Sequence, residues 1–154
     1  MECHTCELVM RRDEGRAPLW DSIYRTDHWD IVHCNDTSLR GWLILVARRH
    51  IAALDEMNTQ EASELGLLIH GVSSALKSAV GCAKTYVVQF AEAAGHQHVH
   101  FHLIPRMPDQ PDDSRGVRVF RHLGVADSYR ISEQVMNDIG QRIRESLSSS
   151  FPLE

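Results

Sequence analysis

The stretch Gly95-His96-Gln97-His98-Val99-His100-Phe101-His102-Leu103-Ile104-Pro105-Arg106 holds four of the chain's ten histidines within seven residues. Side chains on a strand alternate between its two faces, so a strand here would place His98, His100 and His102 on one face, roughly 7 Å apart, and the apolar residues between them on the other. A helix would turn His100 away from the other two. The β-branched and aromatic residues between the histidines favour the strand, and Pro105 is expected to end it.

A single histidine on an apolar strand is ordinarily a hydrogen-bonded structural residue. Three histidines in strict alternation are different, because packing alone would select Val or Ile at those positions. The pattern therefore predicts a metal site, a phosphate site or both.

The composition is that of one ordinary globular domain: 154 residues, 43% hydrophobic and 24% charged. A formal net charge of −5 argues against a nucleic-acid polymer as the main partner. The longest apolar run, Trp42 to Ala47, is too short to span a bilayer, and the N-terminus lacks the apolar region of a signal peptide. The four cysteines fit a reducing compartment. We therefore expect a cytoplasmic protein that is not associated with a membrane.

The expected fold class is α+β, with an antiparallel sheet of about five strands, one long helix and a C-terminal helix. A single domain is expected over residues 1–147, followed by a frayed tail at 148–154. The long helix is indicated by an apolar stripe at three- and four-residue steps, with Asn58 and Glu61 as its cap pair and Gly81 as its stop. Besides the triad stretch, strands are expected at Leu19–Tyr24, Trp29–His33, Gly41–Ala47 and Tyr86–Phe90, and further helices at 7–12 and after Ser132.

Cys3 and Cys6 form a Cys-x-x-Cys pair that could hold one metal ion between two thiolates. A redox role is the weaker alternative, because that motif normally follows a strand and none precedes it here. His50 follows an apolar strand at the start of polar sequence, a place that suits either a ligand or a solvated loop histidine. Cys34 and Cys82 lack such spacing and are interpreted as packing residues.

The heptapeptide from His98 to Ile104 resembles the signature of the histidine-triad (HIT) family, His-φ-His-φ-His-φ-φ with φ apolar, and Arg106 fits its common bacterial ending. The segment from Gly41 to His50 is similar to the family's strand leading to a basic-basic-His sequence. Ala47 departs from the family, which usually has Pro there, and this affects the turn more than the chemistry. The resemblance implies a HIT-like fold.

In zinc-bearing members of the family, the positions that match Cys3, Cys6, His50 and His98 hold zinc. The resemblance therefore implies a structural zinc at these four residues. Four protein ligands leave no open coordination position, so such an ion would tie the N-terminus to the triad strand.

The resemblance further implies a nucleotide hydrolase or transferase in which His100 attacks the α-phosphorus and forms a nucleotidyl-histidine. His102 would neutralise or orient phosphate oxygens, together with the Gln89 amide by family position. Gln89 could equally be an ordinary polar strand residue. Asn35, with His33, lies near the position where the family contacts the nucleoside.

Several family members carry a Ser or Thr just before the triad, which assists the leaving group, whereas Ala91 to Gln97 contains neither. This favours a dinucleoside polyphosphate, or another nucleotide ester or anhydride, over a phosphoramidate. The family resemblance and the open edge strands also predict a homodimer.

Two other functions remain open. One is a metalloenzyme with a catalytic zinc on the His-x-His strand, although no Glu of the kind found in cupins follows before Arg106. The other is a non-catalytic nucleotide-binding protein of the same fold. Metal content separates the first from the HIT-type hydrolase, and turnover separates the second.

Overall fold

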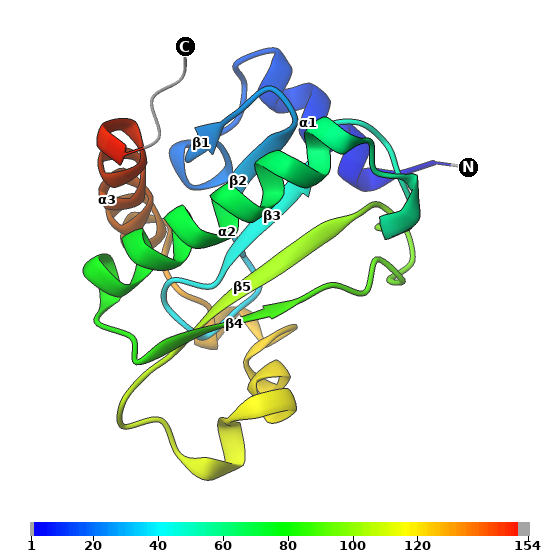
Figure 1. The fold of residues 1–154 in the computed structure, drawn as a ribbon. Coiled ribbons are helices and arrows are strands. Elements are labelled where there is room, and N and C mark those ends of the chain that lie inside the picture. Colours follow the sequence, from blue (N-terminus) through cyan, green and yellow to red (C-terminus); the bar gives the residue numbers. More distant parts are fainter. Residues whose placement is uncertain (1, 151–154) are drawn as a thin grey trace.

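A computed structural model describes residues 2–150. Its five strands form one antiparallel sheet in the order β1-β2-β3-β5-β4, with the long helix α2 across one face (Figure 1). The expected α+β fold, with a long helix and a C-terminal helix, is confirmed. The strands are β1 (Tyr24–Arg25), β2 (Trp29–His33), β3 (Leu43–Ala47), β4 (Lys84–Val88) and β5 (His100–Arg106), and the α-helices are α1 (His4–Asp13), α2 (Thr59–Val80) and α3 (Glu133–Ser150).

Helix α2 begins and ends where local sequence signals place it. The Asn58 side chain accepts from the backbone N–H of Glu61, the Glu61 carboxylate accepts from the backbone N–H of Asn58, and Gly81 ends the helix at φ 71°. Its apolar stripe packs on the sheet face that carries Val99, Phe101 and Leu103, which is the face expected for the residues between the histidines. This packing forms the main core and leaves the other face of the sheet for the triad.

Helix α1 lies on the opposite face of the sheet from α2. Val9 of α1 packs there against Val32 of β2 and Val46 of β3. Helix α3 packs beside α2 through Ile143 and Leu147. It continues to Ser150, so residues 148–150 of the expected tail are helical, and 151–154 lie outside the described residues.

The strand expected at Leu19–Tyr24 is wrong over most of its length. Residues Leu19–Asp21 form a 3-10 turn, and β1 contains only Tyr24 and Arg25. The turn is stabilised by contacts from distant parts of the chain. The Asn137 side chain accepts from the backbone N–H of Trp20, and both Arg11 and Arg12 donate to the Asp21 carboxylate.

The triad strand is also shifted from its expected position. β5 starts at His100, so His98 precedes the strand. The strand then continues through Pro105 to Arg106. β3 pairs with β5 only as far as Leu103. Pro105 can therefore lie inside the strand, because its lack of a backbone N–H costs no hydrogen bond to β3.

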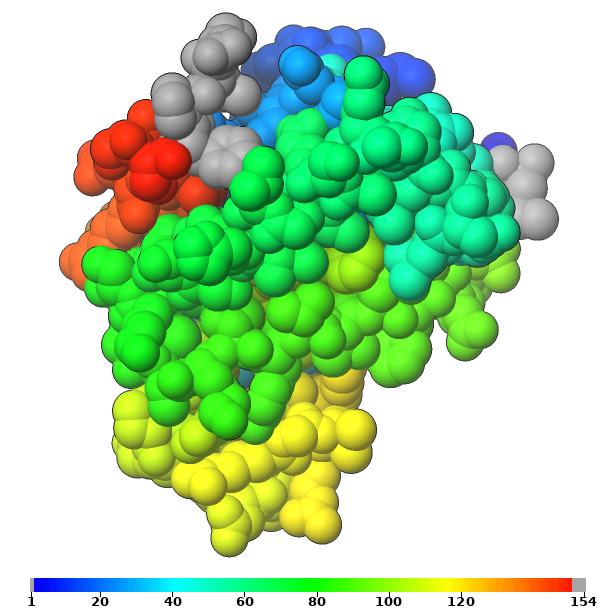
Figure 2. Space-filling view, in the orientation of Figure 1, coloured from blue at the N-terminus to red at the C-terminus, as the bar shows by residue number. Residues whose placement is uncertain are grey.

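The segment from 107 to 124, between β5 and the bridge that pairs Thr37 with Leu123, contains two 3-10 helices, Asp112–Ser114 and Gly116–His122. In the space-filling view it stands out from the body as a lobe (Figure 2). Its inner residues, Val119 and Phe120, pack against Trp42 and Ile104 on the triad face of the sheet. Within residues 2–150, no helix combines the length and apolarity needed to cross a membrane.

Candidate active site and metal centre

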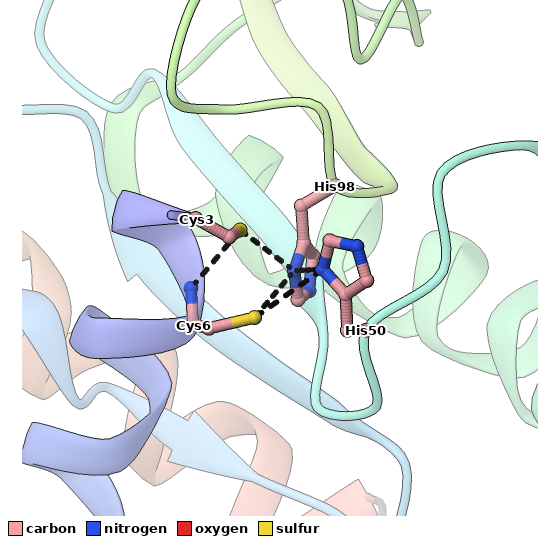
Figure 3. A group of neighbouring side chains, drawn as sticks. All are labelled: Cys3, Cys6, His50 and His98. Carbon is pink, nitrogen blue, oxygen red and sulfur yellow. Dashed lines mark hydrogen bonds between the residues drawn. The ribbon is translucent and has the colours of Figure 1, made fainter. Parts of the chain in front are cut away.

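The structure brings Cys3, Cys6, His50 and His98 together at the N-terminus of α1 (Figure 3). Their ligand atoms all lie within 4.8 Å of one another. Cys3 and Cys6 come from the start of α1, His50 from the loop after β3, and His98 from the loop before β5. The four residues proposed as zinc ligands therefore form one cluster.

Backbone hydrogen bonds fix the segments that carry these residues. The His4 N–H donates to the Gly95 carbonyl at 2.8 Å, which joins α1 to the loop before β5. The Val99 N–H donates to the Ile51 carbonyl at 2.7 Å, which joins the His98 and His50 segments. His98 is buried, and its Nε2–H donates to the Ala47 carbonyl at 2.6 Å. Nδ1 of His98 is therefore left with its lone pair directed into the cluster.

The spacing of the ligand atoms fits a tetrahedral zinc ion. Bonds of about 2.0–2.3 Å at tetrahedral angles separate S and N ligands by roughly 3.3–3.8 Å. The Nδ1 atom of His98 lies 3.6 Å from Cys3 Sγ, 3.5 Å from Cys6 Sγ and 3.2 Å from His50 Nδ1, and Cys6 Sγ lies 3.3 Å from His50 Nδ1. Two sulfurs and two imidazoles also form a donor set that zinc commonly takes in structural sites.

The electrostatics of the cysteine pair also suit a cation. Burial, followed by the hydrogen bond and charge of Cys3, raises the pKa of Cys6 to about 11. A divalent cation between the two sulfurs would remove that penalty on the thiolate forms. The Cys6 backbone N–H also donates to Cys3 Sγ at 3.4 Å, in the way that a helix N-terminus stabilises a negative group.

The His100 ring is held in one tautomer by the backbone. Its Nδ1–H donates to the His98 carbonyl at 2.7 Å, so Nε2 carries the lone pair. The residue is half-buried and lines a cavity of about 560 Å³. An imidazole with a free Nε2 beside a cavity is arranged as a nucleophile or a base.

The His102 ring is held in the opposite tautomer by a side chain. The indole Nε1–H of Trp42 donates to His102 Nδ1 at 3.0 Å, so the His102 proton is on Nε2. Burial, followed by the charge of His100, lowers the pKa of His102 to about 4. His102 is therefore a neutral hydrogen-bond donor near pH 7, able to orient a phosphate oxygen but not to neutralise it.

Strand register places the floor of the cavity in two rows across the sheet. His102 is paired with Ile44 of β3, which is paired with Val32 of β2. His100 is paired in the same way with Val46, and Val46 with Asp30. Adjacent strands lie about 4.8 Å apart. Each imidazole is therefore followed across the sheet by an apolar side chain of β3, and then on β2 by Val32 in the first row and by Asp30 in the second.

One face of α1 lines the same cavity, through Thr5, Leu8 and Arg11 among others. Near the triad, Thr5 Oγ1 lies 2.9 Å from the Nδ1 of His96 in the loop before β5, and both residues line the cavity. A hydroxyl is thus present in the triad cavity although the loop from Ala91 to Gln97 has none.

The two proposed substrate contacts outside the triad differ in their placement. Asn35 is exposed and lines the triad cavity. Gln89 lies just beyond β4 and lines a different cavity of about 510 Å³, with Phe90 and Gln97. The structure therefore brings Asn35, but not Gln89, to the triad cavity.

His33, considered with Asn35 for the nucleoside, is held by the backbone. It is buried, its Nδ1–H donates to the Cys34 carbonyl at 2.6 Å, and its Nε2 accepts from the Gly41 N–H at 3.0 Å. Burial lowers the pKa of His33 to about 4 despite the first of these bonds. Both ring nitrogens are thus used in fixing the loop after β2.

Three features of the site were missed by sequence reasoning. Trp42 gave no signal beyond its place in an apolar strand. Thr5 and Arg11 lie on α1, where only the i, i+3 and i+6 spacing of Thr5, Leu8 and Arg11 could have marked a common face.

Comparison with known proteins supports the signature in the sequence. The HIT domain model matches residues 20–109, more than half of the chain. No curated protein matches.

The fold is shared with solved structures of low sequence identity. A hypothetical histidine triad nucleotide-binding protein from Sulfolobus tokodaii superposes with a TM-score of 0.68 at 15% identity, covering 95% of this chain and 96% of that one. A Zn-bound histidine triad family protein from Mycobacterium smegmatis gives 0.65 at 16%, covering 96% and 94%. The diadenosine triphosphate hydrolase of Plasmodium falciparum gives 0.62 at 14%, covering 84% and 77%. From the family match, the triad and the shared fold, the chain belongs to the HIT domain family.

Proposed function

We propose that this protein is a nucleotide hydrolase or transferase that acts at the α-phosphate of a nucleotide ester or anhydride through a nucleotidyl-histidine intermediate on His100. The observation that carries the proposal is the pair of fixed tautomers: His100 presents a lone pair on Nε2, and His102 presents a proton on Nε2. A nucleophile and a neutral donor lie side by side, with ring centroids 5.2 Å apart.

In the first step, the His100 Nε2 lone pair forms a bond to the α-phosphorus while the bond from phosphorus to the leaving oxygen breaks. The leaving group departs with that electron pair. The His98 carbonyl, which accepts from His100 Nδ1–H, stabilises the positive charge that develops on the ring. The Nε2–H of His102 donates to a phosphate oxygen.

In the second step, a water oxygen bonds to the phosphorus and loses a proton to solvent. The bond from phosphorus to nitrogen breaks, and its electron pair returns to His100 Nε2. The product is a nucleoside monophosphate. If another nucleophile replaces water, the same intermediate gives a transferase.

Zinc bound by Cys3, Cys6, His50 and His98 would act as a cross-link between α1 and the loop before β5. A closed set of four protein ligands leaves no position for substrate, which argues against the metalloenzyme alternative. The thiolate ligands also support a reducing, cytoplasmic location.

A homodimer is part of the proposal. β4 is an edge strand of the sheet, and it carries the exposed Val87, followed by the exposed Phe90. An apolar strand edge of this kind is normally covered in a soluble assembly.

The test is mass spectrometry of rapidly quenched enzyme, kept out of acid, with a dinucleoside polyphosphate as substrate. A nucleotidyl adduct is expected on the peptide that contains His100. His100→Ala should lose the adduct and on the order of a thousandfold or more in turnover, while its affinity for a nucleoside monophosphate changes by no more than about tenfold. Near-wild-type hydrolysis by His100→Ala would exclude the covalent mechanism. Binding with no turnover by the wild type would favour a non-catalytic nucleotide-binding protein.

A further inference from the structure

The end of the triad cavity farthest from the histidines is rich in charge. Arg11 and Arg12 of α1 and Asp21 line it, with Trp20 beside them. The row of paired residues that starts at His100 ends on the same side, at Asp30. Our proposed function places the α-phosphate at the histidines, so this charged end would face the far edge of the base.

Two measures of the distance from the histidine end of the cavity to its charged end both give about the length of one nucleotide. Across the sheet, β5 and β2 are two strand spacings apart, about 10 Å. Along α1, Arg11 lies seven residues beyond His4, which is also about 10 Å at 1.5 Å per residue. Between the two ends, the floor is formed by Ile44, Val46 and Val32. This apolar floor suits the face of a base.

The carboxylates at the charged end are already occupied. Asp21 accepts from Arg11 Nη2 at 2.6 Å and from Arg12 Nη2 at 2.9 Å, and its side chain is 5% exposed. Asp30 accepts from Arg25 at 2.6 and 3.0 Å and from Arg12 Nη1 at 3.4 Å, and its side chain is 2% exposed. Neither offers an open acceptor to a ligand.

Arg11 has hydrogen-bonding capacity left over. Over residues 2–150 its Nη2 donates to Asp21 and its Nη1 makes no hydrogen bond, and the side chain is 35% exposed and lines the cavity. Its Nε also has no partner but is buried, out of reach of a ligand. Arg12, by contrast, uses all three of its nitrogens, because its Nε also donates to the Asp21 carbonyl at 2.7 Å. The charged end of the cavity therefore presents the Nη1 donor of Arg11 and hides its acceptors.

We infer that Arg11 determines base specificity, and that the protein prefers nucleotides of 6-oxopurines, guanine or hypoxanthine, over those of adenine. A guanidinium pairs with the O6 and N7 acceptors of a 6-oxopurine, which is the commonest specific contact between arginine and a base. Adenine keeps N7 but presents an amino group in place of O6, so a donor would face a donor. This inference rests on the proposed function for the placement of the phosphate.

The test is the affinity of the wild-type protein for nucleoside monophosphates, measured by calorimetry at fixed salt. IMP and AMP are the decisive pair, because they differ chiefly in the 6-substituent. IMP and GMP should bind on the order of tenfold or more tighter than AMP. Equal affinity for IMP and AMP would overturn the inference.

Variants at one position separate hydrogen bonding from charge. Arg11→Met should reduce the preference for IMP over AMP to near one, because IMP loses more affinity than AMP. Arg11→Lys keeps the charge but lacks the planar fork, so it should also lose the preference. Full retention of the preference in both variants would overturn the inference.

The control is Arg16→Met, which removes an exposed arginine paired with Glu14, outside the cavity. It should bind like the wild type.

The two proposals fail in different ways. If IMP and AMP bind equally and turnover depends on His100, base specificity is wrong and the hydrolase stands. If no nucleoside monophosphate binds, the proposed function itself is wrong.

Discussion

The hydrogen bond from Trp42 to His102 makes the neutral state of His102 testable. Trp42→Phe keeps an aromatic ring but removes the indole N–H that donates to His102 Nδ1 at 3.0 Å. Both partners are buried, with Trp42 at 0% exposure and His102 at 8%, so the unpaired Nδ1 cannot recover a bond to bulk water without rearrangement. Leaving a buried acceptor without its partner costs about 1–3 kcal/mol.

Without the Trp42 donor, nothing holds Nδ1 as an acceptor, so His102 can move its proton to Nδ1 or turn its ring toward another partner. Either change removes the Nε2–H donor from the cavity. If 1–2 kcal/mol of the loss falls on the transition state, kcat decreases roughly 5- to 30-fold. The effect should appear in kcat more than in KM, because the donor acts most strongly on charge that develops at the phosphate during the reaction.

Steady-state kinetics should be paired with nitrogen-15 NMR of the imidazoles, which reports the tautomer directly. The wild type should show His102 with its proton on Nε2. The matched control is Phe120→Leu, since Phe120 packs edge-on to His102 with ring centroids 5.8 Å apart but makes no hydrogen bond to it. A Trp42→Phe variant with wild-type kcat and an unchanged His102 spectrum would refute this account of the tautomer.

Three further outcomes are expected. Cys3→Ser should abolish binding of about one zinc per chain and lower the melting temperature markedly, with turnover retained in the folded fraction; a metal-free protein that stays fully folded but inactive would indicate a catalytic ion. Since His33 and His102 have pKa values of about 4 in the folded state against 6.5 for free histidine, the unfolded state binds their protons first as the pH falls. The contribution of each histidine to the free energy of unfolding should be full above pH 6.5 and should decrease by about 1.4 kcal/mol per pH unit down to pH 4. When chemical denaturation is used to measure the free energy of unfolding at each pH, its slope against pH should be smaller in His33→Gln than in the wild type by the contribution of one proton. Light scattering at micromolar concentration should give the mass of a dimer, and a monomer mass would count against covering of the β4 edge.

The parts of the fold that follow from local sequence were predictable. The bounds of α2 follow from the Asn58 and Glu61 caps and from Gly81, all within a few residues of the helix ends. The face alternation of the triad follows from strand geometry alone. The turn at Leu19–Asp21 was not predictable in this way, because it is fixed by partners that lie on α1 and α3.

The site divides in a similar manner. Histidine spacing marked His100 and His102, and family resemblance joined His50 and the cysteines to His98. Periodicity could not have done so, because three separate segments carry the ligands. The Trp42 bond to His102 spans 60 residues of sequence, and neither residue type indicates the other. Contacts between distant segments leave no mark on a single sequence.

Helix α1 connects the Cys3, Cys6, His50 and His98 cluster with the triad cavity. Cys3 is the N-cap of the helix and Cys6 lies in its first turn, while Thr5, Leu8 and Arg11 of the same helix line the cavity wall. These three residues share a face at three-residue steps, so the position of the whole wall depends on how the helix start is held. Zinc at the cysteines would fix that start against the loop before β5 without contacting a reacting atom. An ion with closed coordination can thus influence which base is accepted without contact with phosphate or base.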